Sequence, residues 1–266
     1  MIFSWLKKRR RAKWLAQPFP SAWLEILKRN VAPYHGISTE EKAKLRDAVR
    51  VFIAEKNWEG CNGLTVTDEM RVTIAGFACL LLLGLQHDYF SHVLSVLIYP
   101  TDYRAPTKNN KLGVVIETED QRHGEAWYRG PVVLSWQDIQ NDLSHSWDGE
   151  NLVLHEFAHQ LDMLDREVNG TPPLHSRAQA QRWKKVMTAE YHRLLHDARR
   201  GRPTVIDPYG ATNEAEFFAV TTECFFDAPW QLRDEHHELY ELLREYYGQD
   251  PAGWTLDGNV GVGHGR

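Results

Sequence analysis

Hydrophobic positions recur along the chain with two different periods, and these periods predict helices on both sides of a β-rich middle region. In 39–56, Leu45, Val49 and Phe52 recur at helical spacing, so this segment is expected to be an amphipathic helix. A Ser-x-x-Glu sequence stands directly before it and is typical of a capping box at a helix start. The segment 68–88 is apolar on nearly all sides, which predicts a helix at the centre of the core.

Short β-branched runs bounded by Gly, Pro or charged residues predict strands in the middle of the chain, at 92–100, 113–118 and 130–136. Helical patterns follow at 176–200 and 213–226. An earlier helix carries the sequence HEFAHQLD, and Asp148 is our candidate for its N-cap. Strands in the middle with helices before and after them predict an α+β fold with one main core.

Composition excludes several classes of protein. Hydrophobic residues make up 42% and charged residues 25% of the 266 residues, which is typical of a globular protein. The net charge of −5 argues against direct nucleic-acid binding. The three cysteines form no C-x-x-C pair, so a cytoplasmic protein without a thiolate metal site is expected. The longest apolar run, 74–85, falls short of the ~18 residues that a transmembrane helix needs.

The N-terminal segment 1–20 is basic and has no apolar core of a signal peptide. Six lysines and arginines occur by residue 13. Such a segment could contact a membrane surface or another polyanion, or it could be a solvated, frayed terminus, and the second interpretation is favoured. We expect a single domain over 21–256 with a helical N-terminal part (about 21–90), followed by a flexible Gly-rich tail at 257–266.

The sequence His155-Glu156-x-x-His159 is the main chemical signal in the chain. Residues four apart lie on one face of a helix, so both imidazoles can bind one metal ion. From the next position, Glu156 can reach a water molecule at that ion, as in metal-dependent hydrolases. The neighbouring residues are apolar, so the helix is expected to be buried and its polar groups must be ligated or hydrogen-bonded. A core helix with hydrogen-bonded histidines is the alternative.

A third metal ligand is expected on the helix at 213–226, which offers Glu214, Glu216 and Glu223. Glu216 and Glu223 share one face with Ala219, which would let this helix approach the histidine helix closely. Glu216 is therefore the favoured ligand, and Glu223 could hold a ligating histidine from behind. Glu216 could instead only complete a capping box with Asn213. Four phenylalanines of this helix are expected in the core, namely Phe217, Phe218, Phe225 and Phe226.

Two further features have two interpretations each. Asp162, three residues after His159, could orient a histidine or accept hydrogen bonds from nearby backbone amides, and the structural role is favoured slightly. The strand at 131–136 could pair with an extended substrate or be an ordinary core strand.

Four stretches, in this order along the chain, resemble the Mlc titration factor A family of bacterial zinc peptidases, which have a lethal-factor-like gluzincin site. They are LIYP (97–100), GPVVLSWQDIQ (130–140), HEFAHQLD (155–162) and DPYGATNEAEFFAV (207–220). The resemblance implies a zincin-like metallopeptidase domain with a small central sheet, an H-E-x-x-H helix and additional N- and C-terminal helices.

The same resemblance implies the site residues and the activity. His155, His159 and Glu216 match the ligands of one Zn²⁺ ion per chain, Glu156 matches the catalytic base, and Tyr209 matches a tyrosine that faces the zinc. The implied activity is that of an aminopeptidase-like zinc metallopeptidase acting on a peptide or protein substrate. The implied partner is an Mlc-like transcriptional repressor, which would link the chain to sugar phosphotransferase genes. A monomer is expected.

A non-catalytic regulator that sequesters a transcriptional repressor is the alternative function. Such a protein would use zinc only structurally. The presence of Glu156 and Tyr209 argues against it, because a structural zinc site needs neither residue.

Overall fold

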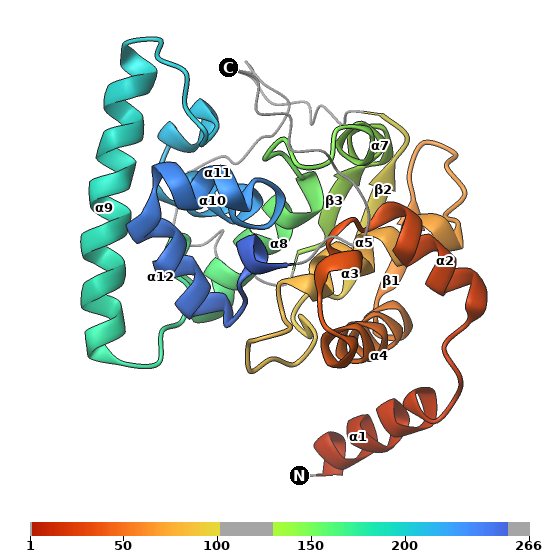
Figure 1. Ribbon diagram of the computed structural model, residues 1–266. Coiled ribbons are helices and arrows are strands. Elements are labelled where there is room, and N and C mark those ends of the chain that lie inside the picture. The colour runs from red at the N-terminus through yellow and green to blue at the C-terminus, as the bar shows by residue number, and fades with distance from the viewer. Residues whose placement is uncertain (1, 102–129, 255–266) are drawn as a thin grey trace.

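The computed structural model describes residues 2–101 and 130–254, which form a mixed α+β structure (Figure 1). The expected strand at 113–118 and the tail at 257–266 lie outside the described residues. One hydrophobic core extends from Ile26 to Ala252 and so includes residues from both halves of the chain. Within the described ranges, no helix combines the length and the apolar composition needed to cross a membrane.

Three short parallel strands form one sheet in the order β1 (Asn57–Gly60), β2 (Ser95–Tyr99) and β3 (Val132–Ser135). Val96 pairs with Val132 and Ile98 with Leu134, and all four side chains are buried. The strands β2 and β3 confirm the two predictions on described residues. Strand β1 was not expected, because its sequence NWEG contains no β-branched residue. In the structure its residues alternate between exposed and partly buried positions.

The N-terminal half packs two helices, α4 (Thr39–Glu55) and α5 (Asp68–Leu80), against each other. The capping box of α4 is formed. The Glu41 amide donates to the Ser38 hydroxyl at 3.2 Å, and the Ser38 amide donates to the Glu41 carboxylate at 2.8 Å. Helix α5 is central and buried, as predicted, but it ends at Leu80 and not at residue 88. A turn follows at 81–84, and Gly84 packs directly on the backbone of Tyr247, where a Cβ atom would lie 2.1 Å from the carbonyl oxygen.

The expectation of a frayed N-terminus was wrong. Residues 2–15 form helix α1 (Figure 1). Arg11 of this helix binds both Glu55 of α4 and Asp88. Helices α2 (Ser21–Asn30) and α3 (Pro33–Gly36) connect it to the core.

The C-terminal half is mainly helical. Its helices are α7 (Trp136–Ser144), α8 (Leu152–Asp162), α9 (Arg177–Arg199), α10 (Glu214–Asp227), α11 (Pro229–Glu235) and α12 (His237–Tyr247). Short 3-10 turns occur at Met163–Asp165, Pro208–Ala211 and Pro251–Gly253. The four phenylalanines of α10 are fully buried, as predicted. Helix α8 packs closely on α10, and α9 lies along the outer side of the molecule (Figure 1).

Candidate metal centre

Helix α8 places the two histidines of the H-E-x-x-H sequence inside the protein. Its N-cap is Asn151, whose side chain accepts a 3.0 Å hydrogen bond from the amide of Leu154. The expectation of Asp148 as N-cap was therefore wrong; its side chain binds the amide of Glu150 in the preceding loop. His155 and His159 are 7% and 2% exposed, and their Nε2 atoms lie 3.2 Å apart.

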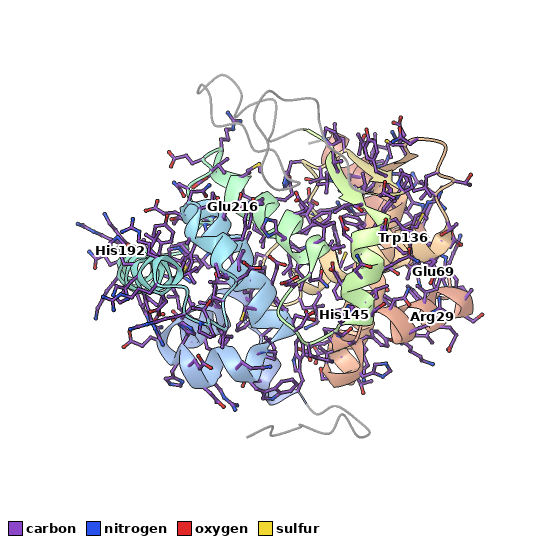
Figure 2. The ribbon with its side chains drawn as sticks, turned by 90° about the horizontal axis from the view of Figure 1, so that it is seen from above. Arg29, Glu69, Trp136, His145, His192 and Glu216 are labelled. Atoms are coloured by element: carbon purple, nitrogen blue, oxygen red, sulfur yellow. The ribbon has the colours of Figure 1, made fainter. Side chains whose placement is uncertain are left out.

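Helix α10 brings Glu216 to these two histidines. Glu216 Oε2 lies 3.1 Å from Nε2 of His155 and 3.5 Å from Nε2 of His159. Figure 2 shows Glu216 on α10 beside α8. The side chain of Asn213 caps α10 by accepting from the Glu216 amide at 2.9 Å, so the backbone of Glu216 serves the cap while its carboxylate faces the histidines. Glu214 is exposed to solvent.

The three side chains fit a metal ion. Their ligand atoms all lie within 4.8 Å of one another, and all three residues are buried. A tetrahedral ion with bonds of about 2.0–2.1 Å separates its ligand atoms by about 3.3 Å, and the observed separations of 3.1, 3.2 and 3.5 Å bracket that value. Glu216 Oε2 is also buried without a hydrogen bond. A divalent cation would satisfy this oxygen and both facing nitrogens together.

The charges of the site favour an ionised carboxylate at its centre. Desolvation opposes ionisation of Glu216, but the adjacent imidazoles of His155 and His159 outweigh it and lower its pKa to about 2. Desolvation likewise opposes the charged form of His155, yet the carboxylates of Glu223 and Glu216 hold its pKa well above the usual value. The cluster therefore has a strong affinity for positive charge, either a proton or a metal ion.

Glu223 hydrogen-bonds to the ring nitrogen of His155 that faces away from Glu216 and His159. Its Oε1 atom accepts a 2.7 Å hydrogen bond from Nδ1 of His155, and its Oε2 atom accepts one of 2.6 Å from the amide of Asn151. With the proton on Nδ1, the Nε2 lone pair of His155 points toward Glu216 and is free to bind a metal.

Two further carboxylates, not expected from the sequence, accept hydrogen bonds from backbone amides in the loop before α8 and at its first residue. Asp227 accepts hydrogen bonds from the amides of Trp147 and Gly149 at 2.9 and 3.0 Å. Asp142 accepts one from the amide of Leu152 at 2.9 Å. The helical pattern contained a signal for Asp227, since it continues the face of Glu216 and Glu223 at the spacing i, i+7, i+11.

Asp162 has the structural role that was favoured. Its two carboxylate oxygens accept hydrogen bonds from the amides of Gly170 and Thr171 at 2.9 and 2.8 Å. Gly170 has a φ of +73° and packs against the carbonyl of Glu214, where a Cβ atom would lie 2.2 Å from the oxygen. This loop therefore ties the end of α8 to the start of α10.

Glu156 and Tyr209 lie next to the metal-binding cluster. Glu156 is partly exposed, and desolvation raises the pKa of its carboxyl although His155 and His159 partly oppose the shift. Asp207 caps the 3-10 turn that carries Tyr209 by accepting from the Tyr209 amide at 2.7 Å. The Tyr209 ring lies 6.1 Å from that of His155, centre to centre. Desolvation and the nearby carboxylates raise the pKa of Tyr209 to about 12, so its phenol stays protonated and can donate a hydrogen bond.

Comparison with known proteins agrees with this architecture. A family model described as "Glucose-regulated metallo-peptidase M90" matches residues 4–248. An uncharacterised protein of Synechocystis is 42% identical over 91% of this chain and 89% of its own length. Proteins named Mlc titration factor A from Yersinia pestis and Yersinia pseudotuberculosis are 31% identical over 93% of this chain and 89% of theirs. The resemblance found in the sequence is thus confirmed, and the helical structure with its small parallel sheet is that of an α+β, zincin-like domain. The chain belongs to the M90 family of glucose-regulated metallopeptidases.

Proposed function

We propose that this chain is a zinc-dependent peptidase in which His155, His159 and Glu216 hold one Zn²⁺ ion. The observation that supports this most directly is the convergence of two imidazole nitrogens and one carboxylate oxygen from two helices, at separations of 3.1 to 3.5 Å. Two nitrogens and one oxygen are a common ligand set of catalytic zinc, which keeps its fourth position open. A zinc ion held by these three residues would supply a Lewis acid and would lower the pKa of a bound water molecule.

Glu156 is the proposed general base. Its carboxyl stands one residue from the first histidine, and its raised pKa makes it a better proton acceptor at neutral pH than an ordinary glutamate. It takes a proton from the attacking water and passes it to the leaving amine. The Tyr209 phenol donates a hydrogen bond to the oxyanion that develops on the substrate carbonyl. Glu223 keeps His155 in the tautomer that a metal ligand needs.

For the substrate we propose peptides with a free N-terminus, as the family resemblance implies. Three carboxylates lie in and around the site, Glu156, Glu216 and Glu223, and their summed negative charge favours a substrate with a positive α-amino group. The three cysteines are free, which fits a reducing cytoplasm. The chain is proposed to act as a monomer.

A second function is supported by the name of the Yersinia relatives, Mlc titration factor A. We propose that an Mlc-like repressor is a protein partner of this chain as well. A purely regulatory protein that sequesters the repressor is the competing function, but such a protein would need neither Glu156 nor Tyr209 beside its metal site.

Metal analysis combined with a peptide-library assay tests the proposed function. The wild-type protein is expected to contain one zinc per chain and to cleave peptides with free N-termini faster than N-acetylated ones. Glu156→Gln is expected to keep zinc and the fold but to lose cleavage, because an amide cannot accept the proton. If the zinc-loaded wild type cuts no peptide, and repressor binding survives chelation, the regulatory function is the correct one.

A further inference from the structure

Helix α1 (Ile2–Leu15) has a strongly basic outer face that the metal site does not use. The helix contains six lysines and arginines and no acidic residue, although the chain as a whole has a net charge of −5. Lys8, Arg9 and Lys13 are exposed, and within the described part of the chain none of the three forms an ion pair. The positive charge of this face is therefore not neutralised by the protein itself.

The opposite face of α1 is fixed to the body of the protein. Arg11 binds Glu55 of α4 through two hydrogen bonds of 2.8 and 2.7 Å, and Lys7 and Arg11 both pair with Asp88. Arg50 of α4, only 9% exposed, donates to the carbonyls of Trp14, Leu15 and Gln17 at the C-terminal end of α1. These contacts hold the helix in one orientation, so the same residues always point outward.

Apolar side chains stand among the outward cations. Trp5 is 58% and Leu6 48% exposed, so two adjacent large hydrophobic side chains face the solvent here. Arg9 lies over the Trp5 ring at 5.4 Å. At helical spacing, Trp5, Arg9 and Lys13 form one row (i, i+4, i+8), and Leu6 stands beside it. Together, Trp5, Leu6, Arg9 and Lys13 make up what is called the outer face below; Arg10 stands at its edge and pairs with Glu55 of α4 at 3.8 Å.

We propose that the outer face of α1 binds the surface of a membrane that contains anionic lipids. Its cations match the negative head groups, and tryptophan beside leucine is suited to the boundary between head groups and acyl chains. A nucleic acid would use the cations but would leave Leu6 in water or against a charged backbone. In Figure 1, α1 lies at one end of the molecule, away from α8 and α10, so a membrane bound there would leave the metal centre open.

Sedimentation of the full chain with lipid vesicles tests this proposal. The protein is expected to bind vesicles of equal parts phosphatidylglycerol and phosphatidylcholine, to bind pure phosphatidylcholine vesicles far less, and to be released by high salt. Arg9→Glu with Lys13→Glu, which removes two cations that form no ion pair among the described residues, should weaken binding by at least about tenfold. Trp5→Ser with Leu6→Ser, which keeps every charge, should weaken it as well. All of these side chains are exposed, and circular dichroism checks that each variant is folded.

Lys184→Glu with Lys185→Glu is the matched control, because both lysines are exposed on α9 and the change in net charge is the same. It should bind like the wild type. Three results would overturn the proposal: no binding to the anionic vesicles, equal loss in the α9 variant, or tighter binding to duplex DNA with no effect of the Trp5 and Leu6 substitutions.

Discussion

The two ends of helix α10 carry buried carboxylates that have opposite surroundings. At the N-terminal end, Glu216 is 2% exposed and faces two imidazoles; at the C-terminal end, Asp227 is 4% exposed and faces backbone amides. The pKa of Glu216 is lowered to about 2, whereas desolvation raises that of Asp227 to about 7. Burial penalises both charges, so the difference comes from their partners. Groups that carry positive charge keep a buried carboxylate ionised, while two amide dipoles do not.

Glu223, midway along the same face, combines both kinds of partner. One of its oxygens accepts from an imidazole and the other from a backbone amide. Along this face of α10, Glu216 is the proposed metal ligand, Glu223 supports the ligand His155, and Asp227 supports the loop before α8. Substitutions along this face measure how sharply these roles are separated.

The largest effect is expected for Glu216→Ala. If Glu216 is a direct ligand, as proposed, its removal should weaken zinc binding by more than the ten- to hundredfold that is typical of a residue that only supports a ligand. The measurement is zinc affinity by competition with a chromophoric chelator. Glu214→Ala is the matched control, since this glutamate lies two residues earlier on the exposed side of α10 and should leave the affinity unchanged. Equal losses in both variants would show that the N-terminal end of α10 does not supply a specific ligand.

Tyr209→Phe should separate chemistry from metal binding at this same end. A phenol that donates to an oxyanion acts mainly in the transition state, so kcat is expected to fall by on the order of a hundredfold. Zinc content should stay at the wild-type level. Wild-type kcat at full zinc occupancy would mean that Tyr209 only packs against the core.

Glu223→Gln tests the middle of the helix face. The amide can no longer accept the Nδ1 proton of His155 with the strength of a carboxylate, so zinc affinity should fall by about ten- to hundredfold while folding persists. Measured in the same chelator competition, the loss should be smaller than for Glu216→Ala. An unchanged affinity would place Glu223 with Asp227 as a support of the loop alone.

The smallest effect is expected for Asp227→Asn, and it depends on pH. The pKa of Asp227 is about 7 in the folded state against an ordinary value of 3.8, so the folded protein binds more protons between these two values. This group therefore makes the wild type less stable as pH rises from about 4 to about 7. An asparagine at this position cannot titrate, so the variant does not lose stability in this pH range. At pH 8 the free energy of unfolding of the variant should therefore exceed that of the wild type by roughly 1–3 kcal/mol. Urea unfolding at pH 4 and at pH 8 measures the difference in free energy of unfolding between variant and wild type. An equal difference at both pH values would contradict a titrating Asp227.

The spacing of residues along the sequence was enough to predict which side chains a single helix brings together. His155, Glu156 and His159 stand at positions that any α-helix brings to neighbouring faces, and Ser38 with Glu41 forms its capping box through adjacent backbone. The helical face of 213–226 likewise favoured Glu216 over Glu214. In each case the geometry follows from a period of 3.6 residues and needs no knowledge of distant contacts.

Tertiary structure decided whatever depends on partners far apart in the chain. Glu223 reaches the amide of Asn151 across 72 positions, and Asp227 reaches Trp147 across 80. Gly84, in the turn after α5, packs on the backbone of Tyr247, and α1 is fixed because Arg11 binds Glu55. Strand β1 exists because β2 supplies its hydrogen-bond partners. Local sequence period carries no information on which distant groups meet, so only packing of the whole chain could select these contacts and bring Glu216 to the two histidines.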